Sequence, residues 1–330
     1  MARALVLRQS AAGTSANVEP ISNADLPDGD VLISVLYSSL NYKDALAVTG
    51  RGKIVRAEYP FVPGIDLVGR VERSDSKLFQ EGDLVIATGW GLGESRWGGY
   101  STVQRVESSN LVRLPRGMEP KTAMAIGTAG LTAMLAAMAL EEHGVDPDRG
   151  DVLVTGATGG VGSIAVAILA ARGYRVVAST GSPDAHAYLE DLGASDILER
   201  SELDKGPDRP MQSARWAGAV DVVGGATLAS IIAALARHGS VAACGLAGGA
   251  DLHTTVYPFI LRGVNLLGID SNTCPTERRI RAWQRLNDTL EPATIARMTS
   301  AVISLDDVPA YSERILDGKV RGRIVVDLSV

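Results

Sequence analysis

The sequence predicts a two-domain α/β protein, in which a β-rich domain accompanies a doubly wound parallel sheet. Its 330 residues exceed the size of one ordinary domain. The first 120 or so residues consist of short β-rich runs with little helical periodicity, whereas strands and helices alternate from residue 151 onward. A hydrophobic fraction of 46% with 21% charged residues is typical of a folded chain.

The composition excludes several classes of protein. A net charge of -6 is opposite to that of a general nucleic-acid binder. Two cysteines, Cys244 and Cys274, supply neither a disulfide framework nor a four-cysteine zinc site. The start of the chain lacks the apolar stretch of a signal peptide, and no uninterrupted run of 18 apolar residues occurs. We therefore expect a soluble cytoplasmic protein with no nucleic-acid or membrane partner.

The β-rich domain is predicted to contain both ends of the chain. Its first strands are runs of β-forming residues bounded by Gly, Pro, Asp or Ser, which favours a barrel or sandwich. These runs are Ala4–Leu7, Val31–Tyr37, Leu67–Glu72 and Asp83–Thr88. A charged amphipathic helix after Thr276 precedes a last strand, Gly322–Leu328, of the same character. We assign residues 1–123 and 271–330 to this domain, and residues 124–270 to the second.

The second domain begins with an Ala-, Leu- and Met-rich helix over 128–142 and continues with repeated strand–helix units. Its strands are expected at Asp151–Thr155, Arg175–Ser179, Asp196–Leu198, Val220–Val223, Ser240–Cys244 and Val264–Ile269, with helices over 161–172 and 227–237. Such units form a parallel sheet that is covered by helices on both faces.

A glycine-rich loop indicates what this sheet binds. Gly156, Gly159 and Gly162 follow the buried strand Asp151–Thr155 and lead into the next helix. A side chain at these positions would hold a pyrophosphate away from the backbone amides, and the start of the helix attracts an anion. Strand, loop, helix and second strand together predict a dinucleotide site, more specifically than the glycine spacing alone.

The end of the second strand favours NADPH over NADH. Sites for NAD usually place an acidic residue there to bind the ribose hydroxyls. Here the strand ends in Ser179, Thr180, Gly181 and Ser182, with no carboxylate before Asp184. No Lys or Arg lies in this turn; Arg200, after the third strand, either pairs with the 2′-phosphate or forms a surface ion pair.

Several uncommon motifs in order carry a resemblance that covers nearly the whole chain. They are SSLNYKDALAVTGRGKI (38–54), PGIDLVG (63–69), TGWGLGESRWGGY (88–100), GTAGLTAM (127–134), CGLAGG (244–249) and PFILRGVNLLGIDS (258–271). The chain resembles the quinone oxidoreductase branch of the zinc-independent medium-chain dehydrogenases/reductases, and within it the bacterial NADPH-dependent acryloyl-CoA reductases. The resemblance implies a GroES-like catalytic domain interrupted in sequence by a Rossmann domain, with the cofactor in the cleft between.

The resemblance also implies roles for individual residues. Tyr42 is expected against the nicotinamide. The pyrophosphate would contact Thr158, Gly159, Gly160 and Val161, and the 2′-phosphate Thr180, Gly181 and Ser182. Further cofactor contacts are expected from Arg200, Leu246, Ile260 and Ser271. Ser182 stands where the family often has a basic residue. Arg323 matches a position near the cleft, although a plain surface arginine is the alternative.

No metal is expected. The zinc-dependent relatives carry Gly-His-Glu where this chain has Gly64, Ile65 and Asp66, and an isoleucine cannot ligate zinc. The structural four-cysteine lobe of those relatives is missing, and the four histidines are scattered without ligand spacing.

The resemblance implies reduction of acryloyl-CoA to propionyl-CoA, which would detoxify an electrophilic thioester arising from three-carbon or dimethylsulfoniopropionate breakdown. The alternatives are reduction of quinones or other α,β-unsaturated carbonyls, and a catalytically idle NADPH-binding protein.

Tyr42 is the candidate that orients nicotinamide and substrate, with Asn41 as its polar neighbour; either could instead be a packed turn residue. The sequence shows no unambiguous acid, so water is the candidate source of the proton and the identity of the donor stays open. For the CoA phosphates, candidate partners on two glycine-rich loops are Arg51, Lys53, Arg56 and Arg96, whose alternative is solvated loop charge. We expect a homodimer through Val264–Ile269, as an edge strand of the sheet.

Overall fold

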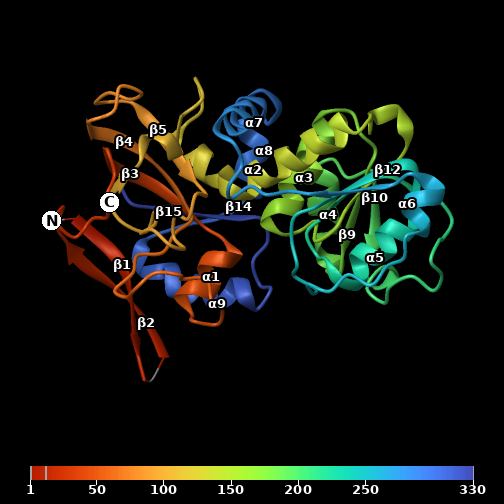
Figure 1. Ribbon diagram of the computed structural model, residues 1–330, viewed down its shortest axis with the longest axis horizontal. Coiled ribbons are helices and arrows are strands. Elements are labelled where there is room, and N and C mark those ends of the chain that lie inside the picture. Colours follow the sequence, from red (N-terminus) through yellow and green to blue (C-terminus); the bar gives the residue numbers. More distant parts are fainter. Residues whose placement is uncertain (1, 12, 330) are drawn as a thin grey trace. The chain divides into compact units, whose positions relative to one another are not determined.

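The computed structural model describes residues 2–11 and 13–329 and divides into two compact units (Figure 1). Unit 1 comprises the chain up to Thr128 together with Asn272–Asn287 and the chain from Ile295 onward. Unit 2 comprises Ala129–Ser271 and Asp288–Thr294. The fold class predicted from the sequence is confirmed, because one unit is built on a mainly antiparallel sheet and the other on a parallel sheet.

Unit 1 contains a seven-stranded sheet and a separate hairpin. Along the sheet the strands are β14 (Thr299–Ile303), β15 (Arg323–Asp327), β3 (Val31–Leu40), β4 (Asp66–Ser74), β5 (Leu84–Thr88) and β7 (Leu111–Arg113), while β6 (Val103–Val106) also pairs with β3. The antiparallel hairpin consists of β1 (Ala2–Ser10) and β2 (Gly13–Ile21). The last strand, β15, pairs with β3 through Ile324 and Leu40, so the end of the chain lies in this sheet.

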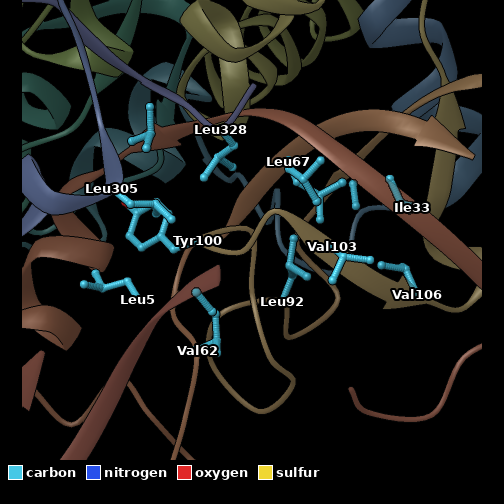
Figure 2. Close-up of a cluster of buried hydrophobic side chains, with 14 of the residues drawn as sticks. Leu5, Ile33, Val62, Leu67, Leu92, Tyr100, Val103, Val106, Leu305 and Leu328 are labelled. Atoms are coloured by element: carbon cyan, nitrogen blue, oxygen red, sulfur yellow. The ribbon is translucent and has the colours of Figure 1, made fainter. Parts of the chain in front are cut away.

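Alternating side chains of these strands build the core of unit 1. In β3, Val31, Ile33 and Val35 are buried while the residues between them are partly exposed, as expected for period-two alternation. Figure 2 shows Ile33 and Leu67 from two paired strands together with Tyr100, from a loop, and Leu305, from the short 3₁₀ helix Leu305–Asp307. The core therefore fixes the loops around residues 62–66 and 92–100 against the sheet.

Unit 2 contains a six-stranded parallel sheet. Its strand order is β10 (Asp196–Glu199), β9 (Val176–Thr180), β8 (Val152–Val154), β11 (Trp216–Asp221), β12 (Leu235–Ala243) and β13 (Asn265–Gly268). In sequence terms this order is 3-2-1-4-5-6, that of a Rossmann sheet. The order reverses between β8 and β11, so the carboxyl ends of these two strands define the place where such sheets bind dinucleotides.

Four helices accompany the strands of unit 2. They are α3 (Gly160–Ala171), α4 (His186–Asp191), α5 (Gly225–Ala234) and α6 (Tyr257–Arg262). Side chains of α5 such as Ile231 and Ile232 pack with Leu153 and Val241 of the strands, and all four are fully buried. Both α3 and α5 are apolar around most of their circumference, as helices buried in a core are.

Helix α2 (Pro120–Glu142) bends at Gly127, whose φ of 52° and ψ of -156° are not helical. By length and composition this helix could cross a membrane, but 94% of its most apolar window is buried inside the protein. It is therefore a core helix, as its Ala-, Leu- and Met-rich sequence suggests.

Several elements differ from the sequence-based expectation. The strand expected at Val220–Val223 is Trp216–Asp221, and the helix expected over 227–237 ends at Ala234, because the next strand begins at Leu235. Five helices were not predicted: α4, α6, α1 (Tyr42–Val48), α8 (Pro292–Met298) and α9 (Val308–Leu316). They are nine residues long or shorter, too short for a clear helical period.

Candidate active site

The glycine-rich loop of unit 2 has the geometry of a pyrophosphate cradle. Gly156 adopts a φ of 55°, which favours glycine, and turns the chain from β8 toward α3. A Cβ at position 162 would lie 2.2 Å from the Gly156 carbonyl oxygen, so only glycine lets the helix approach the loop this closely. The predicted contacts Thr158, Gly159, Gly160 and Val161 are all partly exposed at the start of α3. A phosphate can therefore reach the free amides of this helix end.

The structure brings Arg200 to the end of the second strand of the parallel sheet. A Cβ at position 181 would lie 2.9 Å from Cζ of Arg200, so the guanidinium rests directly on the Gly181 backbone. This proximity follows from parallel pairing. Glu199 pairs with Thr180, so the residues that follow them, Arg200 and Gly181, leave the two strands at the same edge of the sheet. The Ser182 amide donates a hydrogen bond to Thr180 Oγ1 (3.1 Å) and shapes the turn. A guanidinium beside hydroxyl groups fits a phosphate.

One carboxylate lies close to this position. Glu199 ends β10, and its Oε1 lies 3.6 Å from His186 Nε2. Both side chains are more than a third exposed, so this pair is a weak surface contact.

The other predicted cofactor contacts of unit 2 lie on different elements. Leu246 and Ile260 are 67% and 68% exposed, on the loop after β12 and on α6. Ser271 is partly buried, and its Oγ accepts a hydrogen bond from Thr132 Oγ1 at 2.8 Å.

A buried polar cluster occupies unit 1 beneath the start of α1. Asn41 lies at its centre: its Nδ2 donates to Asp44 Oδ2 and Asp66 Oδ2, both at 3.0 Å, and to Ser39 Oγ at 3.1 Å. Its Oδ1 accepts from Arg323 Nη1 at 3.0 Å. The Asn41 side chain therefore uses both of its polar atoms inside the cluster.

Both carboxylates of this cluster accept further hydrogen bonds. Asp44 Oδ1 accepts from the amide of Ile65 (2.9 Å), and Asp44 Oδ2 from the amide of Asn41 (3.0 Å). Asp66 accepts from the Thr128 amide and from the Ser39 and Thr128 hydroxyls. A buried carboxylate is tolerated when such donors surround it.

The cluster holds two carboxylates and one guanidinium away from water. Burial, and after it the neighbouring charge of Asp66, raises the pKa of Asp44 to about 7. Burial likewise raises the pKa of Tyr100 well above its ordinary value, and the Tyr100 hydroxyl donates to the Ser39 carbonyl oxygen at 3.0 Å. Gly127 closes the cluster, since a Cβ there would lie 2.5 Å from Asp66 Oδ2 and 2.9 Å from Arg323 Nη2.

Arg323 is not a surface residue, the alternative that the sequence left open. Its exposed fraction is 3%, and its Nε donates to the carbonyl oxygen of Ala125 at 2.9 Å. Its Nη2 is buried and has no hydrogen-bond partner among residues 2–11 and 13–329. Arg323 therefore serves the buried cluster of unit 1.

Tyr42 and the loop cations differ from this cluster in being exposed. The Tyr42 side chain begins α1 and is 55% exposed. Arg51 forms an ion pair with Glu313, and Arg96 Nη2 lies 2.9 Å from Glu107 Oε1. Lys53 and Arg56 are exposed.

Among residues 2–11 and 13–329, no group of three or more His, Cys, Asp or Glu side chains is placed to hold a metal ion. Ile65 stands beside Asp66, whose carboxylate accepts from Ser39, Asn41 and Thr128.

Sequence reasoning identified the glycine loop but missed the residue that ties it to the neighbouring strand. Asp221 ends β11 with no exposed surface, and its Oδ1 accepts from Thr155 Oγ1 at 2.6 Å. An aspartate inside the apolar run Ala219–Val223 was the available signal.

The fold and the two sites define a two-unit dehydrogenase or reductase of the medium-chain type. Residues 27–116 match the alcohol dehydrogenase GroES-like domain, and residues 160–288 match the zinc-binding dehydrogenase family. The chain is 51% identical over 316 residues to the acrylyl-CoA reductase AcuI of Ruegeria pomeroyi, covering 96% of this chain and 95% of that protein. It therefore belongs to the acrylyl-CoA reductase family of medium-chain dehydrogenases/reductases.

Solved structures of relatives agree with this membership. The yhdH oxidoreductase of Salmonella enterica, solved in complex with NADP, is 48% identical with a TM-score of 0.95, covering 98% of this chain and 99% of that one. The yhfP protein of Bacillus subtilis, solved with NAD bound, is 47% identical with a TM-score of 0.96, covering 99% of each chain. The curated name of that protein is putative quinone oxidoreductase YhfP.

Proposed function

We propose that this protein reduces acryloyl-CoA to propionyl-CoA with NADPH. The proposal rests mainly on the full-length similarity to the acrylyl-CoA reductase AcuI. The glycine loop, with the Arg200 guanidinium against Gly181, supports it. A cation beside the second strand suits a 2′-phosphate, whereas an acidic residue in that place would repel it. The protein would work in the cytoplasm, where NADPH and acyl-CoA thioesters occur, and would remove acryloyl-CoA formed in three-carbon or dimethylsulfoniopropionate breakdown.

The chemistry needs only a few groups from the protein. Bound NADPH supplies a hydride to the β-carbon of the acryloyl group. The electron pair of the carbon–carbon double bond then moves toward the thioester oxygen, and the α-carbon takes a proton to give propionyl-CoA. A hydrogen-bond donor near that oxygen stabilises the negative charge. The exposed hydroxyl of Tyr42 is our candidate donor, and water supplies the proton.

For Asn41 the proposed role is positioning. Its amide and carbonyl groups are engaged by Asp44, Asp66 and Arg323, so they brace the turn from which Tyr42 projects. Asn41 also caps α1 in a reciprocal box with Asp44. The cluster thereby fixes the first residue of α1.

The proposed CoA partners differ in how readily they can bind phosphate. Lys53 and Arg56 are exposed cations. Arg51 and Arg96 each form an ion pair with a carboxylate, and their side chains are 53% and 42% exposed. Exposed pairs contribute about 0–1 kcal/mol, so a CoA phosphate can replace either carboxylate.

Turnover of three substrates with NADPH tests the proposed function. We expect the highest kcat/KM with acryloyl-CoA, a lower value with crotonyl-CoA and the lowest with a quinone. A quinone turned over faster than acryloyl-CoA would favour the alternative activity, which the curated name of the B. subtilis relative supports.

We also propose a homodimer formed through unit 2. Strand β13 lies at the edge of the six-stranded sheet, where its outer backbone groups are available for pairing. Leu266 of this strand is 39% exposed, and Tyr257 and Leu261 of α6 are 50% and 52% exposed. Sedimentation velocity should give a dimer for the native chain and a monomer for Leu266→Lys. A native monomer would contradict the proposal.

A further inference from the structure

Asp221 lies at the carboxyl end of β11, the strand beside the glycine loop. Its carboxylate is buried and surrounded by donors. Oδ1 accepts from Thr155 Oγ1 at 2.6 Å and from the Val223 amide at 3.3 Å, and Oδ2 accepts from the Gly224 amide at 2.8 Å. Three donors on one carboxylate offset the cost of burying its charge.

These hydrogen bonds join the ends of three neighbouring strands. Thr155 follows β8 and immediately precedes Gly156, and its Oγ1 accepts from the Val222 amide at 3.1 Å. The Asp221 carbonyl oxygen accepts from the amide of Cys244, which follows β12, at 2.9 Å. The residue thus connects β8, β11 and β12 at the edge where parallel sheets bind dinucleotides.

The turn that Asp221 holds also supports the loop of Leu246. Gly224 has a φ of 73°, which favours glycine, and the Asp221 carboxylate accepts a hydrogen bond from its amide. The Val223 carbonyl oxygen accepts from the Gly248 amide at 2.7 Å. A Cβ at position 245 would lie 2.3 Å from the Val222 carbonyl oxygen, so the loop is seated directly on the turn.

The same turn reaches the glycine loop. A Cβ at position 156 would lie 2.5 Å from Cγ2 of Val222, so this side chain packs against Gly156. Movement of the 222–225 turn would therefore displace both the glycine loop and the loop of Leu246.

We propose that Asp221 is a positioning residue that fixes these loops for the nicotinamide half of the dinucleotide. In a sheet of this order the adenosine half lies over β9 and β10, where Arg200 meets Gly181, and the nicotinamide half lies over β11 and β12. Asp221 acts through the backbone of the turn and through Thr155. The inference rests on the proposed use of NADPH, and it assigns the buried carboxylate to one half of that ligand.

Two ligands separate the halves: NADPH, and 2′,5′-ADP, which contains only the adenosine part. Asp221→Asn replaces one acceptor oxygen with a donor that faces either the Gly224 amide or the Thr155 hydroxyl. We expect the Kd for NADPH, measured by fluorescence titration, to rise about tenfold or more while the Kd for 2′,5′-ADP changes less than twofold. Equal weakening of both ligands, or unchanged NADPH binding, would overturn the proposal.

A second pair of variants keeps the test valid if Asp221→Asn does not fold. Thr155→Val removes the hydroxyl donor and keeps the shape, whereas Thr155→Ser retains the donor. Thr155→Val should raise the Kd for NADPH severalfold without changing the Kd for 2′,5′-ADP. Thr155→Ser, which keeps the hydroxyl, should bind NADPH with the affinity of the native protein. Identical NADPH affinity in both variants would contradict the role of Asp221. Because binding is measured without substrate, a failure of acryloyl-CoA turnover would count against the proposed function alone.

Discussion

Arg323 Nη1 donates a hydrogen bond to Asn41 Oδ1 at 3.0 Å, across a separation of 282 residues in the chain. The contact joins the last strand of unit 1 to the cap of α1. Through it, one buried guanidinium lies in the same cluster as the carboxylates of Asp44 and Asp66. The closing strand of the chain thus supplies the cation that the first part of unit 1 requires.

Removal of Arg323 should destabilise the protein strongly. Arg323→Met leaves two buried carboxylates without their cation, a change that typically costs about 3–5 kcal/mol. Urea unfolding of the variant should show this loss in the free energy of unfolding. Arg8→Ala is the matched control, since it breaks an exposed pair with Glu19 and should cost no more than about 1 kcal/mol. A cost for Arg323→Met as small as that of the control would contradict the buried-cation role.

Asp44 should make stability depend on pH. Its folded pKa of about 7 lies above the usual unfolded value, so between about pH 4 and 7 the folded state binds a proton that the unfolded state has lost. This contribution to stability is present at low pH and is lost as the pH rises through 7. Relative to Asp44→Asn, the native protein should lose free energy of unfolding between pH 5 and 8. Parallel pH curves for the two proteins would be inconsistent with a raised pKa, and exposed Asp306→Asn is the control.

Arg200→Ala should weaken NADPH selectively. Loss of one charged contact to a phosphate costs about 1.5–3 kcal/mol, or roughly ten- to a hundredfold in affinity. We expect the KM for NADPH to rise by that factor while the KM for NADH hardly changes. Equal losses with both cofactors would mean that the guanidinium at Gly181 has a structural role.

Tyr42→Phe tests the proposed donor. If its hydroxyl stabilises the charge on the thioester oxygen, kcat for acryloyl-CoA should fall by about a hundredfold, the usual cost of losing one such donor. Tyr59→Phe, which removes another hydroxyl of unit 1, should leave kcat unchanged. Full activity of Tyr42→Phe would contradict the donor role and would mean that the Tyr42 ring contributes only packing.

Turnover should not require a metal ion. Ile65 supplies no ligand beside Asp66, and the Asp66 carboxylate is occupied by hydrogen-bond donors. Exhaustive dialysis against a chelator should leave kcat unchanged. Loss of activity that zinc restores would refute this expectation.

Local sequence patterns were sufficient to predict the two kinds of sheet and the dinucleotide loop. Period-two burial in β3, the apolar run of β8 and the spacing of Gly156, Gly159 and Gly162 are local properties, because they follow from strand geometry and from the freedom of glycine. For the same reason the edge strand β13 could be located from its own residues. Short helices such as α1 could not, since seven residues give too few turns for a period.

The pairing of the buried polar side chains, in contrast, depends on contacts between residues that are distant in the sequence. Asn41 contacts Arg323, and Thr155 contacts Asp221, across 282 and 66 residues. Nothing in the neighbouring sequence selects such partners, because a buried polar group is satisfied by whichever donor or acceptor the closed sheet brings within 3 Å. Arg200 reaches Gly181 for a related reason, since parallel pairing places the residues after two strand ends at one edge.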